Sequence, residues 1–451
     1  MPAIAADGAT HIIAEFARTT RGSDLPDPVR HEARRSLLNI IGCTVGGSRH
    51  PAVETLWKAT APFAGAPQST LIGRGTRTDA LSAALLNTFS SSINTYDDTH
   101  AEAIIHPSGP VMAAVLAVAE RQPTTGADLL TAFALGVEVA CRLSKAVSVA
   151  PAQGNMAWSQ TGICSGVAAA AAAGRLLGLD SLGMRRAIGI AASQASGIRA
   201  LHGSMCTAKM PAHAGHTGLR AAYLAEAGFT ASEGAIEGRY GFGVCFSVAP
   251  HLPHLTGELG SRWEILGNTY KPFPCGIVVN PLIDAALQMR REHEIDPARI
   301  VSVAVNASPA ALALCNRPSP KDELEAQVSL HHWIASAFVR GRASVADGVD
   351  AAIQDPALAA FRARVHPTAD SAVPIDGVDM SVTLADGRKL EKRLRDCIGS
   401  RGRPMTDAEL EAKVGGLADG VLPADRVTRL IAETWAIDRL DDAAKLVRLA
   451  S

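Results

Sequence analysis

The sequence predicts a mainly helical protein that carries a smaller α+β domain. The chain has 451 residues, more than one hydrophobic core usually organises, so two domains are expected. Up to about residue 230, apolar residues recur at helical spacing with almost no strict alternation. Alternating β-branched segments then appear between helices. We therefore expect helices over residues 1–265, an α+β domain over 266–404, and helices again over 405–451.

Composition narrows the class of protein. Hydrophobic residues make up 47% of the chain and charged residues 19%, which is typical of a globular protein. The net charge is −1 and there is no basic block, so nucleic acid is not an expected partner. The eight cysteines are scattered without a CxxC pair, and we interpret them as reduced thiols of a cytoplasmic protein.

Neither a signal peptide nor a membrane span is expected. The N-terminal residues lack the basic region and the long apolar core of a signal peptide. The most apolar run, residues 165–174, is too short and too rich in alanine to cross a bilayer. Its small residues instead favour a buried helix in a tightly packed bundle.

The N-terminal helices follow from capping residues and apolar periodicity. Asp27 and Pro28 open a helix whose apolar residues are spaced by four, and Gly46-Gly47 ends it. Thr161 is expected to cap an alanine-rich helix. Helices are expected over residues 79–93, 111–120, 127–147, 163–176, 181–193 and 213–227.

The C-terminal half mixes strands and helices. Residues 300–305 alternate and are β-branched, which indicates a strand. Two extended runs, 378–384 and 388–394, flank Asp386-Gly387 and predict a hairpin. Helices are expected over 280–292, 327–340 and 425–435, and Thr406 with Glu409 has capping-box spacing.

One polar cluster precedes an apolar helix and is the first candidate site. Asp97, Asp98, Thr99, His100 and His106 fall within ten residues. A proline follows the last histidine and places it on a bend. The helix start that comes next would favour an anion, so the cluster suits a carboxylate substrate. The alternative is that the acid and the following serine are caps and that the histidines lie on the surface.

Residues 193–216 form a second candidate, expected as a bent connection because glycines interrupt it. The segment holds Arg199, His202, Lys209, His213 and His216. Its lysine could hold a carboxylate or move a proton if burial lowers its pKa; the alternative is a solvated loop lysine. Its last two histidines have i, i+3 spacing, but no third ligand is apparent, so no metal site is expected.

Lys271 opens a stiff K-P-F-P-C-G loop at the expected domain border. It is a candidate anion contact, and the alternative is a simple hinge. The sequence contains no Walker loop, no GxGxxG after a strand and no GxSxG elbow, which disfavours nucleotide-dependent and serine-hydrolase chemistry.

A series of segments spans most of the chain: YDDTH (96–100), HPSGPV (106–111), TGICSGVAAAAAAGRLLGLD (161–180), SQASGI (193–198), KMPAHAGHTGLRAAYLAEAGF (209–229), IEGRYGF (236–242), KPFPCGIVVNPLIDAAL (271–287) and EAQVSLHHWIASAFVRG (325–341). Taken in this order, they resemble the MmgE/PrpD family, which includes 2-methylcitrate dehydratase, cis-aconitate decarboxylase and iminodisuccinate epimerase. Each segment alone is weak evidence, but their order is specific.

The resemblance implies an architecture and a site. Residues 1–265 and 405–451 would form one helical domain, with the α+β domain of residues 266–404 inserted. Family members are usually homodimers that need no cofactor, and their active site lies in a cleft between the domains. The family's functional positions match Asp97, Asp98, Thr99, His106, Lys209 and Lys271.

The sequence also departs from the family pattern. A common acid is replaced by Thr95, and histidines found in relatives are replaced by Ser159, Asn280 and Gly276. The lysine segment is one residue longer than usual, which puts the match of Lys209 in doubt. These departures disfavour a faithful cis-aconitate decarboxylase and weaken a 2-methylcitrate dehydratase assignment.

The family resemblance and the residues together predict a cofactor-independent enzyme that abstracts a proton next to a carboxylate of a di- or tricarboxylic acid. Either His106 or Lys209 would be the base and the other residue the acid, and Asp97 would orient the histidine. The expected substrate contacts are Asp98, Thr99, Ser108, Ser159, Arg199 and Lys271. A 2-methylcitrate dehydratase-like hydro-lyase is the first hypothesis, an iminodisuccinate-like epimerase the second, and a non-catalytic paralogue the third.

Overall fold

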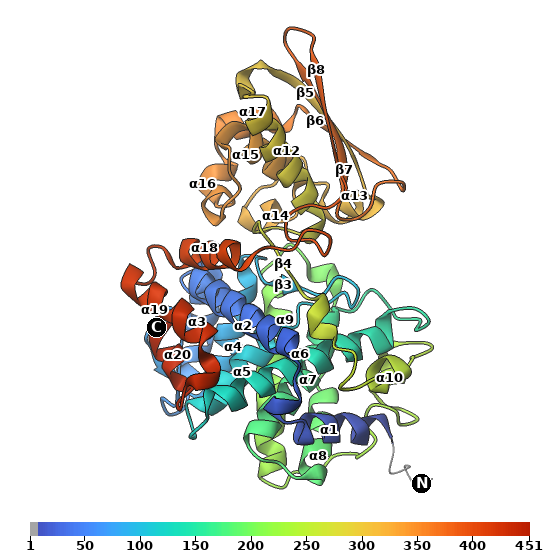
Figure 1. Ribbon diagram of the computed structural model, residues 1–451, viewed down its shortest axis with the longest axis vertical. Coiled ribbons are helices and arrows are strands. Elements are labelled where there is room, and N and C mark those ends of the chain that lie inside the picture. The colour runs from blue at the N-terminus through green and yellow to red at the C-terminus, as the bar shows by residue number, and fades with distance from the viewer. Residues whose placement is uncertain (1–7) are drawn as a thin grey trace. The chain divides into compact units, whose positions relative to one another are not determined.

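The computed structural model describes residues 8–451, which divide into two compact units (Figure 1). The first unit contains the described residues up to Ile93, together with Asp97–Asn268 and Asp407–Ser451. The second contains Asn94–Tyr96 and Thr269–Thr406. The predicted fold class, mainly α with a smaller α+β domain, is confirmed. Residues 1–7, on which the expectation of no signal peptide partly depends, lie outside the described residues.

The first unit is a helical bundle with one small hairpin. Its helices are α1 (Ala9–Thr19), α2 (Asp27–Gly47), α3 (Pro51–Thr60), α4 (Ala80–Ile93), α5 (Ser108–Ala119), α6 (Gly126–Ser148), α7 (Gln160–Leu176), α8 (Ser181–Ala192), α9 (Cys206–Glu226), α10 (Phe242–Phe246), α11 (Pro253–Thr256), α18 (Asp407–Ala418), α19 (Ala424–Trp435) and α20 (Ala444–Leu449). Strands β1 (Ser69–Thr70) and β2 (Arg77–Thr78) pair antiparallel, and β3 is Asp98–Thr99. Among residues 8–451, none of the helices combines the length and apolar character that crossing a bilayer needs.

The alanine-rich helix α7 lies in the core of this bundle and packs against α5, α6, α8 and α9. Its residues from Ala168 to Ala173 are at most 1% exposed. Gly218 of α9 allows the backbones of α7 and α9 to come close together. A Cβ atom at this position would lie 2.4 Å from the carbonyl oxygen of Gly166 and 2.6 Å from Ala169 Cβ. Small residues therefore set the distance between the two helices, as the sequence suggested.

We expect the Gly218→Ala substitution to destabilise the protein by about 2–3 kcal/mol, because the added methyl group meets main-chain atoms that cannot rotate away. The free energy of unfolding from urea denaturation measures this effect. Gly416→Ala in α18 is the matched control, since a Cβ at Gly416 meets no atom within 4 Å. Replacing a helical glycine there should stabilise the protein by about 0.5–1 kcal/mol. Equal effects of the two substitutions would contradict the proposed close contact.

The first described helices and the C-terminal residues belong to the same helical unit. Helix α18 packs against α2, where Arg35 forms an ion pair with Asp407 and Lys413 donates a hydrogen bond of 2.7 Å to Asn39. Helix α19 contacts α2 and α20. The last 45 residues thus complete the same core that the first helices begin.

Several helix boundaries differ from the sequence prediction. Helix α2 begins at Asp27, but its N-cap residue is Pro26 and not Asp27. Helix α9 begins at Cys206 and includes Pro211, whereas residues 193–216 were expected to form a bent connection. Pro211 is the sixth residue of the helix and removes one main-chain hydrogen bond, and burial of the α9 face offsets that loss.

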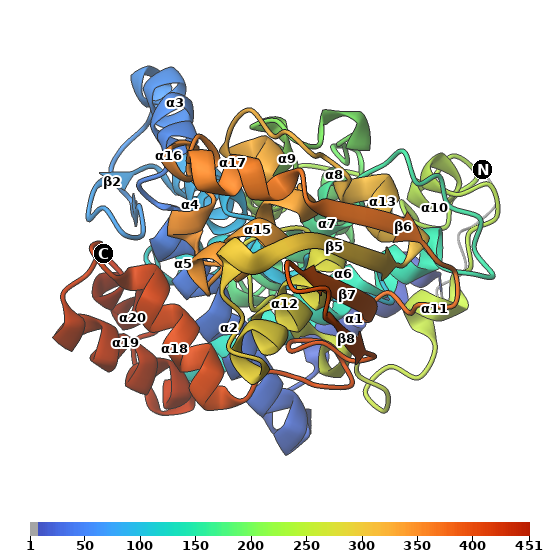
Figure 2. The ribbon, with the colours of Figure 1, turned by 90° about the horizontal axis from the view of Figure 1, so that it is seen from above.

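The second unit is built on a four-stranded mixed sheet with strand order β6-β5-β7-β8, and Figure 2 shows the strands side by side in that order. Its strands are β5 (Ile300–Ala307), β6 (Val365–Ala369), β7 (Val378–Leu384) and β8 (Lys389–Leu394), and the two-residue strand β4 (Thr269–Tyr270) also belongs to this unit. The predicted hairpin is present, with Val378 opposite Leu394. The parallel strand β6 was missed because its sequence, VHPTA, contains a proline and lacks apolar alternation.

Helices cover one face of this sheet. They are α12 (Asn280–Glu292), α13 (Pro309–Cys315), α14 (Glu323–Ala326), α15 (Leu330–Arg340), α16 (Asp350–Ile353) and α17 (Pro356–Arg362). Helices α12 and α15 pack against each other and contact the sheet (Figure 1). Strand β7 alternates between buried and half-buried residues, as a sheet with one covered face requires. Trp333, which is fully buried, belongs to the resulting core.

Candidate active site

The first candidate site is a bend that carries His106 into the start of helix α5. The main-chain N–H groups of His100 and Ile105 donate to each other's carbonyl oxygen, at 2.9 and 3.3 Å, and close a tight turn. His100 Nδ1 accepts a hydrogen bond of 3.1 Å from the Ala103 N–H. The His106 side chain is 38% exposed, so its ring can reach solvent or a small molecule.

The tautomer of His106 is set by the main chain. Its Nδ1 lies 2.8 Å from the carbonyl oxygen of Asp98 and 3.0 Å from Thr99 Oγ1. A carbonyl oxygen can only accept, so Nδ1 carries the proton and the neutral ring keeps its lone pair on Nε2. Asp97 was expected to orient this ring; its Oδ1 lies 3.9 Å from His106 Nδ1, which is longer than a hydrogen bond, so the orienting role stays a prediction.

Helix α7 begins beside this histidine. The His106 N–H donates a hydrogen bond of 3.0 Å to Thr161 Oγ1. Thr161 was expected to cap α7, but the N-cap is Ser159, whose hydroxyl accepts from the Gly162 N–H at 3.2 Å. Ser159 therefore has a structural role as the N-cap of α7, and its predicted substrate contact stays a prediction; Thr161 holds the main chain of His106.

Asp98 lies beneath the bend and is buried. One carboxylate oxygen, Oδ2, accepts hydrogen bonds of 2.5 Å from Ser108 Oγ and from Asn268 Nδ2. Burial raises the pKa of Asp98 to about 6, against the opposing effect of these two donors, and the nearby Asp97 charge raises it further. Asp98 and Ser108 are completely buried and bond to each other, so they support the bend; the substrate contacts predicted for them stay a prediction.

A buried ion network lies on helix α6. Glu138 and Arg142 are both 0% exposed and share a hydrogen bond of 2.6 Å. Glu138 also accepts from the main-chain N–H groups of Glu264 and Ile265, at 3.0 and 3.1 Å. Arg142 donates to carbonyl oxygens of residues 257, 258 and 262, at 2.7, 3.4 and 2.5 Å. The pair therefore fixes the 257–265 segment to α6.

Glu264 connects this network to the bend. Its carboxylate accepts two bonds of 3.0 Å from Lys145 Nζ and lies 3.4 Å from His100 Nε2. Burial acts to raise the pKa of Glu264, but the donors His100 and Lys145 lower it to about 2. Ser144, which like Lys145 belongs to helix α6, donates a hydrogen bond of 2.5 Å to the Ala103 carbonyl. Helix α6 thus holds the turn that precedes His106.

The second candidate segment brings a cluster of basic groups to the start of α9. Lys209 lies in the first turn of that helix, and burial lowers its pKa. Burial also lowers the pKa of His213, and the positive charge of Lys209 lowers it further. Burial lowers the pKa of His202 as well, and the positive charge of Arg199 lowers it further. The lysine is thus partly desolvated among other basic groups, which makes it a better proton carrier than a solvated lysine.

The two candidate segments converge on the start of α7. A Cβ at Gly162 would lie 2.4 Å from the Ser196 carbonyl and 3.4 Å from Met210 Cβ, so the residue after Lys209 packs beside the residue after Thr161. Arg199 donates to the Trp158 carbonyl at 3.1 Å and to the Gln160 side chain. Arg199 therefore braces the 158–160 segment, and its predicted carboxylate contact would have to use its remaining donors.

We predict that His216 makes the protein less stable in acid. Burial lowers its pKa to about 4, and the Arg220, His213 and Lys209 charges act in the same direction. Below about pH 6.5 the His216 imidazole is protonated in the unfolded chain but stays neutral in the folded chain. Stability should therefore fall by about 1 kcal/mol per pH unit from about pH 6.5 to pH 4 through this group alone.

The measurement compares unfolding free energies of the wild type and His216→Gln between pH 4.5 and 8. The glutamine variant should gain stability relative to wild type as the pH falls below 6.5, and the difference should be constant above pH 7. A difference that stays constant down to pH 4.5 would contradict the prediction.

Lys271 lies in the second unit and directly follows strand β4. It is only 2% exposed. The loop after it is held by a 2.7 Å hydrogen bond from Tyr96 Oη to the Pro272 carbonyl and by a 2.9 Å bond from the Gly276 N–H to the Gln327 carbonyl. Its predicted carboxylate contact stays a prediction.

Sequence reasoning missed most of the supporting residues. Asn268 bonds Asp98 across 170 positions of sequence, and no local pattern marks it. The pair Glu138 and Arg142 was detectable, because two opposite charges four residues apart interrupt the otherwise apolar helix α6. The family resemblance implied histidines at the positions of Ser159 and Asn280. In the structure Ser159 caps α7, and Asn280 is buried at the start of α12.

Comparisons with known proteins add independent evidence. The model of the MmgE/PrpD N-terminal domain matches residues 11–253, and that of the MmgE/PrpD C-terminal domain matches residues 273–437. The cis-aconitate decarboxylase of Aspergillus terreus (strain NIH 2624 / FGSC A1156) is 26% identical over 99% of this chain and 96% of its own length. The Homo sapiens cis-aconitate decarboxylase is 27% identical over 97% of this chain and 94% of its own length. The cis-aconitate decarboxylase of Mus musculus is 26% identical over 98% of this chain and 93% of its own length.

Proposed function

Because this chain belongs to the MmgE/PrpD family, we propose that it is an enzyme that transfers a proton at a carbon next to a carboxylate of a small di- or tricarboxylic acid. The observation that carries the proposal is the setting of His106. Its Nδ1–H is fixed on the Asp98 carbonyl, and its exposed ring leaves Nε2 as the basic atom. An imidazole in this state takes or gives a proton near neutral pH, as general acid–base catalysis requires.

The residues around His106 suit both steps of the reaction, the removal of a proton from carbon and the delivery of a proton. When Nε2 takes a proton from carbon, the C–H electron pair moves into the adjacent carboxylate and forms an enediolate. The imidazolium is stabilised by the Asp97 carboxylate at 3.9 Å. We assign Thr99 and Lys209 to the substrate carboxylate and its developing charge. A second proton from the lysine, or the return of the first, completes the reaction.

Decarboxylation of cis-aconitate is the first reaction to test, because the named relatives are cis-aconitate decarboxylases along nearly their whole length. The carbon–carboxylate bond breaks, carbon dioxide leaves, and the electron pair shifts across the double bond. An acid then delivers one proton to carbon, which gives itaconate. In this direction His106 or Lys209 acts as the proton donor.

Dehydration of a 2-methylcitrate-like hydroxy acid is the second candidate, with epimerisation of an iminodisuccinate-like compound as its variant. The resemblance to the family pattern implies histidines at the positions of Ser159 and Gly276, and their replacement here favours a reaction other than decarboxylation. In dehydration the base removes the proton and a neighbouring hydroxide leaves with a second proton. A homodimer in the cytoplasm remains the expected form of the enzyme.

Proton NMR with the purified protein and a panel of cis-aconitate, 2-methylcitrate, citrate and iminodisuccinate tests the proposal. New vinylidene signals from cis-aconitate would support a carboxy-lyase, and new olefinic signals from a hydroxy acid would support a dehydratase. A changed diastereomer ratio with an intact skeleton would support an epimerase. An unchanged panel, with the protein folded, would contradict the proposal.

A further inference from the structure

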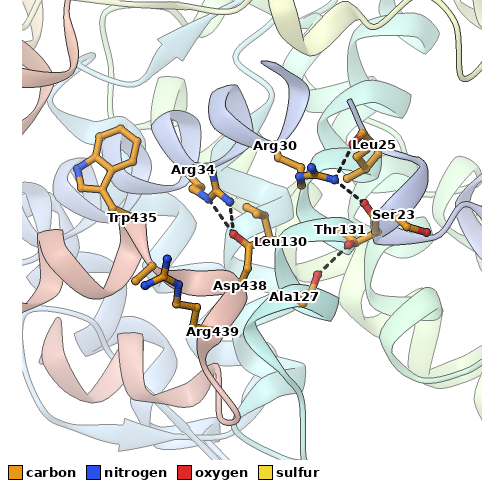
Figure 3. Close-up of a pocket in the computed structure, with 12 residues that line it drawn as sticks. Ser23, Leu25, Arg30, Arg34, Ala127, Leu130, Thr131, Trp435, Asp438 and Arg439 are labelled. Carbon is orange, nitrogen blue, oxygen red and sulfur yellow. Dashed lines mark hydrogen bonds and ion pairs between the residues drawn. The ribbon is translucent and has the colours of Figure 1, made fainter. Parts of the chain in front are cut away.

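A hollow of about 680 Å³ lies in the first unit, and none of its lining residues is assigned above to catalysis. It is formed by the start of α2, the first turns of α6 and the end of α19 (Figure 3). All of its lining residues belong to the same compact unit. The volume is within the range of roughly 300–1,000 Å³ that is typical of small-molecule sites.

The charge of the lining is unbalanced. The lining contains three arginines, Arg30, Arg34 and Arg439, and one acidic residue, Asp438. The lining itself therefore carries an excess of two positive charges. Asp27, which pairs with Arg30, lies outside the lining, and its side chain is 88% exposed, so solvent screens its charge.

The hydrogen-bond donors of two arginines are not used up. Arg34 binds Asp438 through Nε, at 2.9 Å, and through Nη2, while its Nη1 has no partner among the described residues. The Arg439 side chain has no hydrogen bond or ion pair within residues 8–451. Figure 3 shows the Arg34 and Arg439 side chains on different sides of Asp438. Arg30 differs, because it donates to the Gly22 and Leu25 carbonyls and holds that turn.

The remaining wall limits what can fit. Trp435 lines the hollow, and its indole is held in place by a 2.7 Å hydrogen bond to Glu411 and by stacking on His31. Leu25 and Leu130 add apolar surface. A preformed hollow with unused guanidinium donors and little acceptor capacity selects a compact oxyanion, because guanidinium groups bind carboxylates and phosphates through paired hydrogen bonds.

We propose that this hollow binds a small anion with at least two negative charges, a di- or tricarboxylate or a phosphate, at a site separate from the His106 bend. Arg439 and the free edge of Arg34 bind the anion, and Asp438 keeps Arg34 in position. The proposal rests on charge and donor geometry alone and is independent of the reaction that the enzyme performs.

Calorimetric titration of the whole chain with citrate and with inorganic phosphate, at constant ionic strength, tests this site. Arg439→Ala should weaken binding by about tenfold, the value expected for loss of a charge-assisted hydrogen bond. Arg429→Ala is the matched control, since Arg429 is exposed like Arg439 and carries the same charge but lies outside the lining. This control should change the affinity by less than twofold.

A second readout places the anion in the hollow. Binding should change the tryptophan fluorescence of the wild type, and Trp435→Phe should remove that change while the calorimetric signal remains. Tighter binding of citrate would identify a carboxylate site, and tighter binding of phosphate a phosphate site. Equal affinities in Arg439→Ala and Arg429→Ala, or no binding of either anion to the wild type, would overturn the proposal.

Discussion

Replacement of His106 by glutamine should lower kcat by about a thousandfold, because the variant keeps a hydrogen-bonding side chain but loses the only basic atom of that side chain. The fold should survive, since the His106 ring is 38% exposed and its N–H to Thr161 bond belongs to the main chain. The measurement is the steady-state rate on whichever acid the panel identifies, together with the thermal midpoint.

The control for this result is His254→Gln. His254 is a half-buried histidine whose Nε2 contacts the Ala150 carbonyl at 3.0 Å, and it plays no part in the proposed site. It should leave kcat unchanged. A His106→Gln protein that is folded and turns over at the wild-type rate would remove His106 from the mechanism and leave Lys209 as the base to examine.

The second large effect concerns stability. Arg142→Met should cost about 3–5 kcal/mol, because it leaves the Glu138 carboxylate buried without its cation and leaves carbonyl oxygens of the 257–262 segment without their donor. Burial already raises the pKa of Glu138 against the effect of that cation, so the variant should take up a proton there on folding. Urea denaturation measures the loss.

Arg262→Met is the matched comparison, since Arg262 pairs with Glu258 and Glu264 but its side chain is 45% exposed. Exposed pairs contribute roughly 0–1 kcal/mol, so this variant should remain close to wild type. If both substitutions cost the same, the buried network would not be what fixes the 257–265 segment. If Arg142→Met does not fold, the double variant Glu138→Gln with Arg142→Met should recover part of the loss.

The sequence predicted which helices and strands are present better than it predicted where each of them begins and ends. Apolar periodicity predicted most helices of the first unit, and the Asp386-Gly387 pair predicted the hairpin of β7 and β8. The start of α9 was misplaced by several residues, because a proline and a glycine normally end a helix. There, packing against α7 outweighs local preference, and packing partners are not visible in a single sequence.

The candidate site shows the same division. The bend at His106 followed from the proline after it, and the local chemistry of residues 97–108 was visible as a cluster of polar side chains. The sequence could not show that the Asp98 carbonyl oxygen sets the tautomer of His106, because every residue has a main-chain carbonyl. Asn268, which bonds Asp98, comes from a distant part of the chain, so only the folded chain reveals it.

The central claim is that this protein transfers a proton at a carbon next to a carboxylate. The most direct test is to run the reaction with cis-aconitate in D₂O and to count the deuterium atoms in the product by NMR and mass spectrometry. Proton delivery to carbon by an exchangeable side chain predicts one deuterium per itaconate molecule, placed at the carbon that was protonated. Turnover that gives a product without carbon-bound deuterium would contradict the claim, because it would show that no solvent-exchanging group handles that proton.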